Sequence, residues 1–112
     1  MKSEIYDALP TSQSMAATFN GPWISVGELR GFAIDLVLAG GGTPGGAFKL
    51  QWTNDISVGG SYDVASSSYT VTDDGSNGWQ VVDPTYRFVR VVYTRTSGTA
   101  TVSCSKMNRK FY

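Results

Sequence analysis

Acidic side chains gathered in one loop are the first candidates for chemistry in this sequence. The run DDGSNG at residues 73–78 offers Asp73, Asp74, Ser76 and Asn77, whose oxygens are of the kind that Ca²⁺ binds in proteins. Their spacing does not match an EF-hand loop, and no bidentate glutamate follows. Because Asp-Gly and Asn-Gly pairs are also the usual residues of tight turns, we expect a turn here and no metal site.

Groups that could catalyse a reaction are few. The 112-residue chain has no histidine, which removes the commonest general base and the commonest metal ligand. A glycoside hydrolase needs a carboxylate pair, but nothing in the aspartate spacing selects one from Asp55, Asp63, Asp73, Asp74 and Asp83. The single cysteine, Cys104, lies in an apolar strand pattern and is expected to be a packed core thiol. We therefore predict no enzyme activity, no catalytic residue and no cofactor.

Aromatic side chains could instead bind a sugar by stacking, with Asp and Asn neighbours to orient it. Trp79, Tyr62 and Tyr69 are the residues predicted to be exposed for this purpose. Trp23 and Trp52 lie within apolar strand patterns, and a core position is predicted for both. The glycine-rich segment GGGTPGG at residues 40–46 lacks the Lys-Ser/Thr pair of a P-loop and the GxGxxG spacing, so we expect a flexible hairpin loop.

The elements that must position these residues are strands. Apolar residues never recur at the helical period over three turns, whereas short runs alternate with a period of two. The clearest run is residues 47–53, where Phe48, Leu50 and Trp52 are predicted to face inward. With 16% charged residues and 13 glycines, about eight short strands are expected. We predict an all-β, eight-stranded antiparallel β-sandwich of jelly-roll type, with an immunoglobulin-like sandwich as the alternative.

The densest cluster of β-branched and aromatic residues lies at residues 86–105, which we interpret as a central hairpin turning at residues 96–99. Two arginines interrupt its first run. Arg87 and Arg90 are three residues apart and project from opposite faces of a strand, so at most one can lie in a core. One of them is predicted to reach a buried or inter-subunit acid, with Asp35 and Asp55 as the candidates.

Charge is segregated along the chain, although the net charge is zero. Residues 50–86 contain five aspartates and no Lys or Arg, whereas residues 87–112 contain six Lys or Arg and no acid. This pattern suits packing against copies of the same chain, unless strands from the two stretches interleave in the fold. With a sequence pI of about 6.1 and no recognised motif, nucleic-acid binding is not expected. No apolar run approaches the ~20 residues of a membrane span, and the polar start carries no secretion signal.

Four motifs in residues 31–105 occur in a fixed order. They are GFAI at residues 31–34, FKLQWTND at residues 48–55, Gly78-Trp79, and YRFVRVVYT at residues 86–94 running into Ser97-Gly98-Thr99. In this combination the chain resembles the small β-sandwich or jelly-roll structural proteins of tailed bacteriophages and related viruses, of the decoration, head-fibre or minor capsid type. The resemblance implies assembly as trimers or higher rings.

The resulting prediction is a non-enzymatic virion protein: a capsid decoration, minor capsid or spike/fibre component that is made in the host cytoplasm. Its expected partners are other virion proteins and copies of itself, with no nucleic acid and no membrane. The alternative is a carbohydrate-binding module for attachment to a host surface.

The predicted organisation is an N-terminal arm (residues 1–12), a sandwich domain (13–105) and a basic-aromatic tail (106–112). The two ends carry apolar and aromatic residues that a monomer explains poorly. They are therefore the predicted docking segments, through Ile5, Tyr6, Leu9, Arg109, Lys110, Phe111 and Tyr112. Deletion of residues 106–112 is expected to leave the fold intact and to abolish incorporation into the virion.

Overall fold

The computed structural model describes residues 3–10 and 12–112, and every regular element in them is a β-strand. The strands of this described part are β1 (Ser3–Asp7), β2 (Gln13–Ser14), β3 (Phe19–Asn20), β4 (Ile24–Ser25), β5 (Leu29–Thr53), β6 (Tyr62–Asp63), β7 (Tyr69–Val71), β8 (Gly75–Val82) and β9 (Phe88–Phe111). All pairings are antiparallel. These residues include no helix that is long and apolar enough to cross a membrane.

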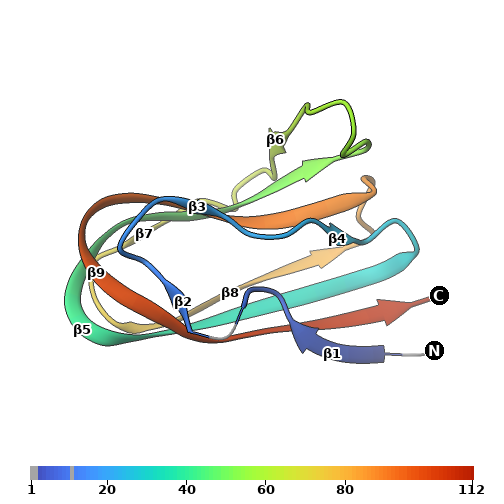
Figure 1. Ribbon diagram of the computed structural model, residues 1–112. Helices are drawn as coiled ribbons and strands as arrows, with labels where there is room; N and C mark the ends of the chain where they lie inside the picture. The colour runs from blue at the N-terminus through green and yellow to red at the C-terminus, as the bar shows by residue number, and fades with distance from the viewer. Residues whose placement is uncertain (1–2, 11) are drawn as a thin grey trace.

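The two long strands, β5 and β9, pair with each other and bend over together, so that each contributes to both layers of a sandwich (Figure 1). The lower layer contains β1, the second half of β9, the first half of β5, and β8. The upper layer contains β3 and β4, the first half of β9, the second half of β5, and then β6 and β7.

This order identifies the sandwich type. When each half of β5 and β9 is counted separately, each layer has four strand segments in the order given above. In chain order the eight segments are β1, β3 with β4, the two halves of β5, β6 with β7, β8, and the two halves of β9. The first segment pairs with the last, the second with the seventh, the third with the sixth and the fourth with the fifth. This is the wrapped order of a jelly roll. The predicted eight-stranded antiparallel jelly-roll sandwich is confirmed.

The turn positions within it were predicted wrongly. Residues 40–46 are not a hairpin loop, because they lie within β5, and residues 86–105 are not a hairpin, because residues 88–105 belong to the single strand β9. The two stretches pair with each other at the bend, where the register shifts between Ala39 and Gly42 and again up to Gly46. Such bulges increase twist and bend a strand pair. The glycine-rich segment therefore turns the sheet from one layer to the other.

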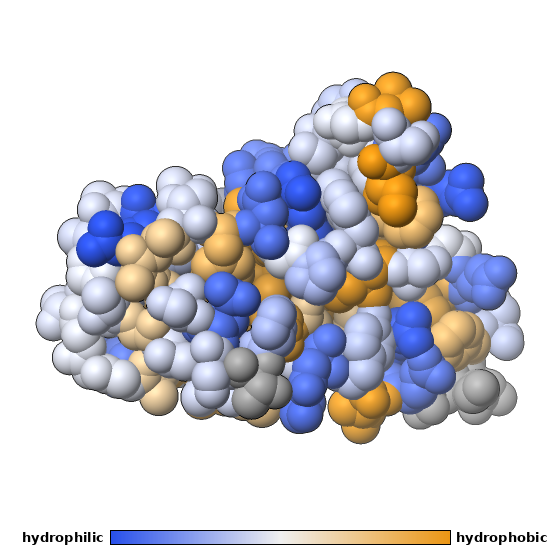
Figure 2. Space-filling view, viewed as in Figure 1, coloured by the Kyte–Doolittle hydropathy of each residue, from blue (hydrophilic) through white to orange (hydrophobic). Residues whose placement is uncertain are grey.

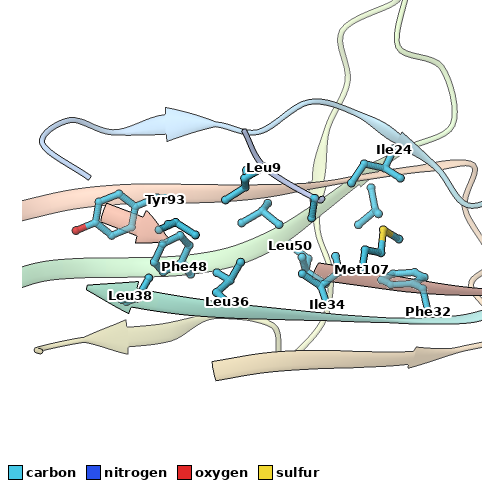
Figure 3. Packing of buried hydrophobic residues seen from close by; sticks show 14 of the residues in the cluster. Leu9, Ile24, Phe32, Ile34, Leu36, Leu38, Phe48, Leu50, Tyr93 and Met107 are labelled. Carbon is cyan, nitrogen blue, oxygen red and sulfur yellow. The ribbon is translucent and has the colours of Figure 1, made fainter. Parts of the chain in front are cut away.

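The hydrophobic core fills the space between the two layers (Figure 3). Phe48 and Leu50 face inward from the upper layer, as predicted, and both are fully buried. The lower layer contributes alternate residues of β5 together with residues of β9, among them Phe32, Ile34, Leu36, Leu38, Val102 and Met107. This alternation is the period of a strand with one face on a core.

The two ends of the chain belong to the lower sheet. β1 pairs with β9 from Ser3 opposite Lys110 to Asp7 opposite Lys106. Met107 and Leu9 are core residues, with 0% and 2% of their surfaces exposed. Deletion of residues 106–112 would remove part of a central strand and the buried Met107, which argues against the expectation that the fold survives this deletion. Residues 1, 2 and 11 of the predicted arm lie outside the described residues.

One face assignment in β9 also differs from the prediction. Ala100 and Val102 are buried as expected, but Cys104 is partly exposed. The register shifts between Val37 and Leu38, so that they pair with Cys104 and Val102. This bulge turns Cys104 outward and places Ser105 inside, where its hydroxyl accepts from the Leu9 N–H at 2.9 Å and donates to the Leu9 carbonyl.

The basic strand β9 lies between β1 and β5, and acids of β1 neutralise part of its charge. Lys106 contacts Asp7 at 2.6 Å, and Arg109 pairs with Glu4. On the upper layer Lys49 lies 3.0 Å from Asp63. Two bases of β9 are thus matched by acids of β1, whereas β6, β7 and β8 of the acidic stretch pair with β5 and not with β9, so strands of the two stretches do not interleave.

Candidate interaction surfaces

The loop between β5 and β6 projects from the body of the sandwich and carries exposed apolar side chains (Figures 1 and 2). Ile56 is 52% exposed, Val58 is 79% exposed and Tyr62, at the end of the loop, is 58% exposed. We call these three residues the apolar lobe. The side chains of Ile56 and Val58 lie outside the core of their own chain, so they add nothing to its packing.

Hydrogen bonds within the loop hold the apolar lobe outward. The Asp55 carboxylate accepts from the Ser57 N–H at 2.9 Å and from the Ser57 hydroxyl at 2.6 Å. These two bonds keep the pKa of Asp55 below its usual value. Behind the lobe, the Trp52 ring lies 4.9 Å from Tyr62 and 5.6 Å from Tyr86. Trp52 has the predicted inward direction, but it closes the open end of the sandwich and is only half-buried.

The three aromatic residues predicted to stack on a sugar do not share one exposed face. Trp79 and Tyr69 contact each other at 5.4 Å, and Tyr69 stacks on the core residue Phe48 at 5.7 Å. The Trp79 indole N–H donates to the Ser67 carbonyl at 2.7 Å. Tyr62 instead belongs to the apolar lobe. Trp79 and Tyr69 therefore close one side of the core, and the predicted platform is not formed.

Tyr69 provides a prediction about alkaline stability. Its hydroxyl is buried without a hydrogen-bond partner among the described residues, and burial raises its pKa well above the usual 10.0. Burial likewise raises the pKa of Tyr6 to about 12. Since the folded pKa exceeds the unfolded one, the stabilisation by the neutral phenol is complete below about pH 10 and is lost as the pH rises through the folded value.

We therefore expect the free energy of unfolding of Tyr69→Phe at neutral pH to lie within about 1 kcal/mol of the wild-type value, because an unpaired buried hydroxyl contributes little to stability. Above pH 10 the variant should lose less stability than the wild type. Urea unfolding across this pH range measures the difference, and absorbance at the tyrosinate band should show one late-titrating phenol fewer. Tyr62→Phe, at an exposed position, is the control. An alkaline profile of Tyr69→Phe that matches the wild type would contradict the expectation.

A second cluster lies on the outer face of the upper layer. The Arg90 guanidinium stacks 4.3 Å above the Trp23 ring and donates to the Gln51 side-chain oxygen at 2.8 and 3.1 Å. Within one copy, Arg90 bonds to Gln51 and not to either predicted acid, Asp35 or Asp55, and its guanidinium is attracted to the Trp23 ring. Trp23 is half-buried on this outer face and is not the predicted core residue.

Arg87 also departs from the prediction. Its guanidinium lies over the Phe88 ring at 5.7 Å, and its backbone N–H donates to the Asn54 side chain at 3.1 Å. The Asp55 carboxylate is hydrogen-bonded to Ser57, as described above, and the charge of Arg87 is only a minor cause of its lowered pKa. Asp35 is exposed on the outer face of the lower layer.

The predicted docking residues at the two ends fall into three groups. Leu9 is a core residue and cannot bind a partner. The Arg109 guanidinium stacks between the rings of Tyr6 at 4.3 Å and Phe111 at 5.5 Å and pairs with Glu4, so these residues fasten β1 to β9. The exposed positions are Ile5 at 69%, Tyr112 at 82%, and Lys110.

A shallow groove of about 450 Å³ crosses the outer face of the lower layer. Its floor is made by Gly31 and Ala33 of β5, whose side chains are small. Larger side chains of the two neighbouring strands form its walls: Gln80 and Val82 from β8, and Asn108 and Lys110 from β9. The groove thus follows from small residues on a strand between two strands with larger ones.

Of the run at residues 73–78, only Asp73 and Asp74 lie in the turn between β7 and β8, whereas residues 75–78 belong to β8. The Asp74 N–H bonds to the Asp73 carboxylate at 2.7 Å, and the Asp74 carboxylate accepts from the Gly41 N–H of the bend at 3.0 Å. Asp74 therefore fastens the β7–β8 turn to β5. No cluster of three or more His, Cys, Asp or Glu side chains that could hold a metal ion is found in residues 3–10 and 12–112.

The fold is shared with solved structures. The crystal structure of the SPBc2 prophage-derived protein YomS is similar to this chain with a TM-score of 0.60 at 12% identity, over 96% of this chain and 92% of that one. A crystal structure of PirA is similar with a TM-score of 0.52 at 16% identity, over 98% and 93% of the two chains. A CBM4 structure gives a TM-score of 0.49 at 16% identity, over 98% and 68%.

At these identities the likeness to YomS and PirA concerns the fold alone. No protein-family model matches the chain, and no curated protein matches it.

Sequence reasoning missed two of the three residues of the apolar lobe. Ile56 and Val58 were not selected, because single apolar residues in a polar loop give no periodic signal. The detectable signal was their place between Asn54-Asp55 and Gly59-Gly60, which shows that both belong to a turn region. Two β-branched apolar residues in such a region have no strand face to occupy.

Proposed function

We propose that this chain is a non-enzymatic structural protein of a phage particle, of the decoration, minor capsid or spike/fibre type. In this role it is located in the virion and acts by binding other virion proteins and copies of itself. The observation that carries the proposal is the apolar lobe, where Ile56 and Val58 project from a compact sandwich with 52% and 79% of their surfaces exposed. Exposed apolar surface of this kind marks protein-binding sites.

Two further observations support this role. A protein derived from a prophage, YomS, has the same fold over 92% of its own length. In addition, Ile5 of β1 and Tyr112, which directly follows β9, are exposed, and β1 and β9 are paired, so one neighbour can contact both side chains. A carbohydrate-binding role has less support, because Trp79, Tyr62 and Tyr69 are divided between two clusters.

The test is whether the chain is part of the particle. Particles released by the phage or lysogen that encodes it are banded on a density gradient, and their proteins are quantified by mass spectrometry. We expect the chain in the particle band at several copies per particle. A chain that is abundant in the lysate and absent from the banded particles would overturn the proposal.

The same preparation tests the apolar lobe. The double variant Ile56→Asp/Val58→Asp should reduce incorporation at least about tenfold, because charged side chains cannot be buried in an apolar contact. Ala17→Asp is the matched control, since Ala17 is exposed in the loop between β2 and β3. Circular dichroism of each purified variant should match the wild type. Equal incorporation of the lobe variant and the control would show that the lobe is not a contact.

A further inference from the structure

The edges of the two sheets differ in a way that points to a partner. The upper sheet ends in β3 and β4 on one side and in β6 and β7 on the other, and these strands have only two or three residues each. One edge of the lower sheet is β1, which carries Glu4 and Asp7. Short strands and charged side chains are the usual protection of a sheet edge against pairing with another chain.

The fourth edge, β8, has none of this protection. It is eight residues long, and its sequence GSNGWQVV contains no charged residue and no proline. It pairs with β5 over eight consecutive positions, from Gly31 opposite Val82 to Leu38 opposite Gly75, without a register shift. No strand of the described residues covers its other side. An edge of this length and composition is a template for adding a strand.

The backbone groups that β8 presents to a partner follow from its pairing with β5. The Asp83 N–H donates to the Arg30 carbonyl at 2.7 Å, so odd-numbered residues of this segment face β5. In an antiparallel ladder the alternate residues then face the free edge, which are Ser76, Gly78, Gln80 and Val82. All four are exposed. The Gly78 N–H is already bonded to its neighbour's side chain, the Asn77 amide oxygen, at 2.8 Å, and strand pairing replaces this one bond.

We propose that β8 of one copy pairs with β8 of a second copy, antiparallel and about a two-fold axis, so that the two lower layers become one continuous sheet. The absence of charge on β8 favours a second copy of the chain as its partner. A two-fold contact brings residues of one copy near the same residues of the other, so a charged edge would bring like charges together, whereas β8 does not. The nearest acids, Asp74 and Asp83, are each hydrogen-bonded within their own copy, to the Gly41 N–H and the Tyr112 hydroxyl.

The register is constrained by the same alternation. Residues that face the free edge must pair with each other, and the register that uses all four of them places Ser76 opposite Val82 and Gly78 opposite Gln80. Trp79 then lies opposite Trp79 at the axis. Aromatic pairs at such positions add to the stability of a sheet. This contact deepens the proposed structural role and, as a contact of the particle, rests on it.

The test uses the purified full chain in sedimentation velocity over a wide concentration range. We expect a monomer–dimer equilibrium, together with slower amide exchange of Gln80 and Val82 at high concentration. Gln80→Pro removes an N–H that faces away from β5, which an edge strand tolerates. Because two hydrogen bonds are lost per dimer, the dissociation constant should rise at least about tenfold. Val82→Lys, which adds a charge to the edge, should have the same effect without a backbone change.

Ile5→Pro is the matched control on the other edge of the same sheet. The Ala8 N–H donates to the Ser105 carbonyl at 3.0 Å, so even-numbered residues of β1 face β9 and Ile5 faces outward. This variant should dimerise as the wild type does. A wild type that stays monomeric with unprotected Gln80 and Val82 amides would overturn the proposal, as would undiminished dimers of both Gln80→Pro and Val82→Lys. Neither result bears on particle incorporation, which is measured separately.

Discussion

Gly98→Ala should destabilise this protein by at least about 3 kcal/mol, whereas Gly41→Ala should cost only about 1–2 kcal/mol. Both glycines lie at the bend of the long strands, and both have left-handed backbones with φ of +68° and +64°. The backbone penalty for an alanine is therefore nearly equal. The surroundings differ: a Cβ on Gly98 would lie 2.0 Å from the Thr43 carbonyl oxygen, whereas one on Gly41 would meet nothing within 4 Å.

The clash at Gly98 is with backbone and cannot be relieved by rotating a side chain. The Thr43 carbonyl belongs to β5 at the point where β5 and β9 bend together, so moving it disturbs the pairing that joins the two layers. Urea unfolding followed by circular dichroism measures both variants against the wild type. Equal losses of stability would mean that the left-handed backbone conformation alone makes glycine necessary. The close contact between Gly98 and the Thr43 carbonyl would then contribute nothing to the cost of the substitution.

The bend also shows which part of the fold the sequence could predict. Strand positions and faces follow from alternation, so the strand at residues 47–53 and the core positions of Phe48 and Leu50 were predicted correctly. Whether a glycine-rich stretch ends a strand or bends it could not be predicted, because both need residues that tolerate left-handed backbones. The distinction depends on which strand lies opposite, and that is a long-range property of the sheet.

The errors in side-chain environment have a related cause. Trp52 has the inward direction expected from its strand, but it lies at the open end of the sandwich and is covered by Tyr62 and Tyr86 only in part. Cys104 lies on the opposite face from the one predicted, because the register of β5 and β9 shifts between Val37 and Leu38. Alternation gives the direction of a side chain but neither its distance from the end of a sheet nor the presence of a bulge.

The candidate surfaces were less predictable than the core. Residues at both chain ends were selected because they are apolar or aromatic, but pairing of β1 with β9 buries Leu9 and fastens Tyr6 and Arg109 within the sheet. Ile5 and Tyr112 remain exposed. The free edge of β8 is a property of topology, since nothing in its eight residues states that they lie at the margin of a sheet.

Phe48→Ala should have the largest effect of any core truncation in the upper layer, with a loss of about 3–5 kcal/mol. Phe48 is fully buried, and its ring lies 4.6 Å from Tyr93, 5.7 Å from Tyr69 and 6.2 Å from Phe19. These rings come from four different strands of the upper layer. Removing the central ring leaves a cavity that the remaining three cannot fill without moving their strands.

Phe88→Ala is the matched control, because Phe88 lies in the same layer on the outer face and is only half-buried. It should cost about 1 kcal/mol, in proportion to the smaller area removed from contact. Both variants are compared in urea at one protein concentration, with equal denaturant slopes as the check that the unfolded states are alike. A domain of this size has a total stability of about 5–15 kcal/mol, so Phe48→Ala alone could leave the chain partly unfolded. Similar losses for the two variants would contradict a core that is confined to the space between the layers.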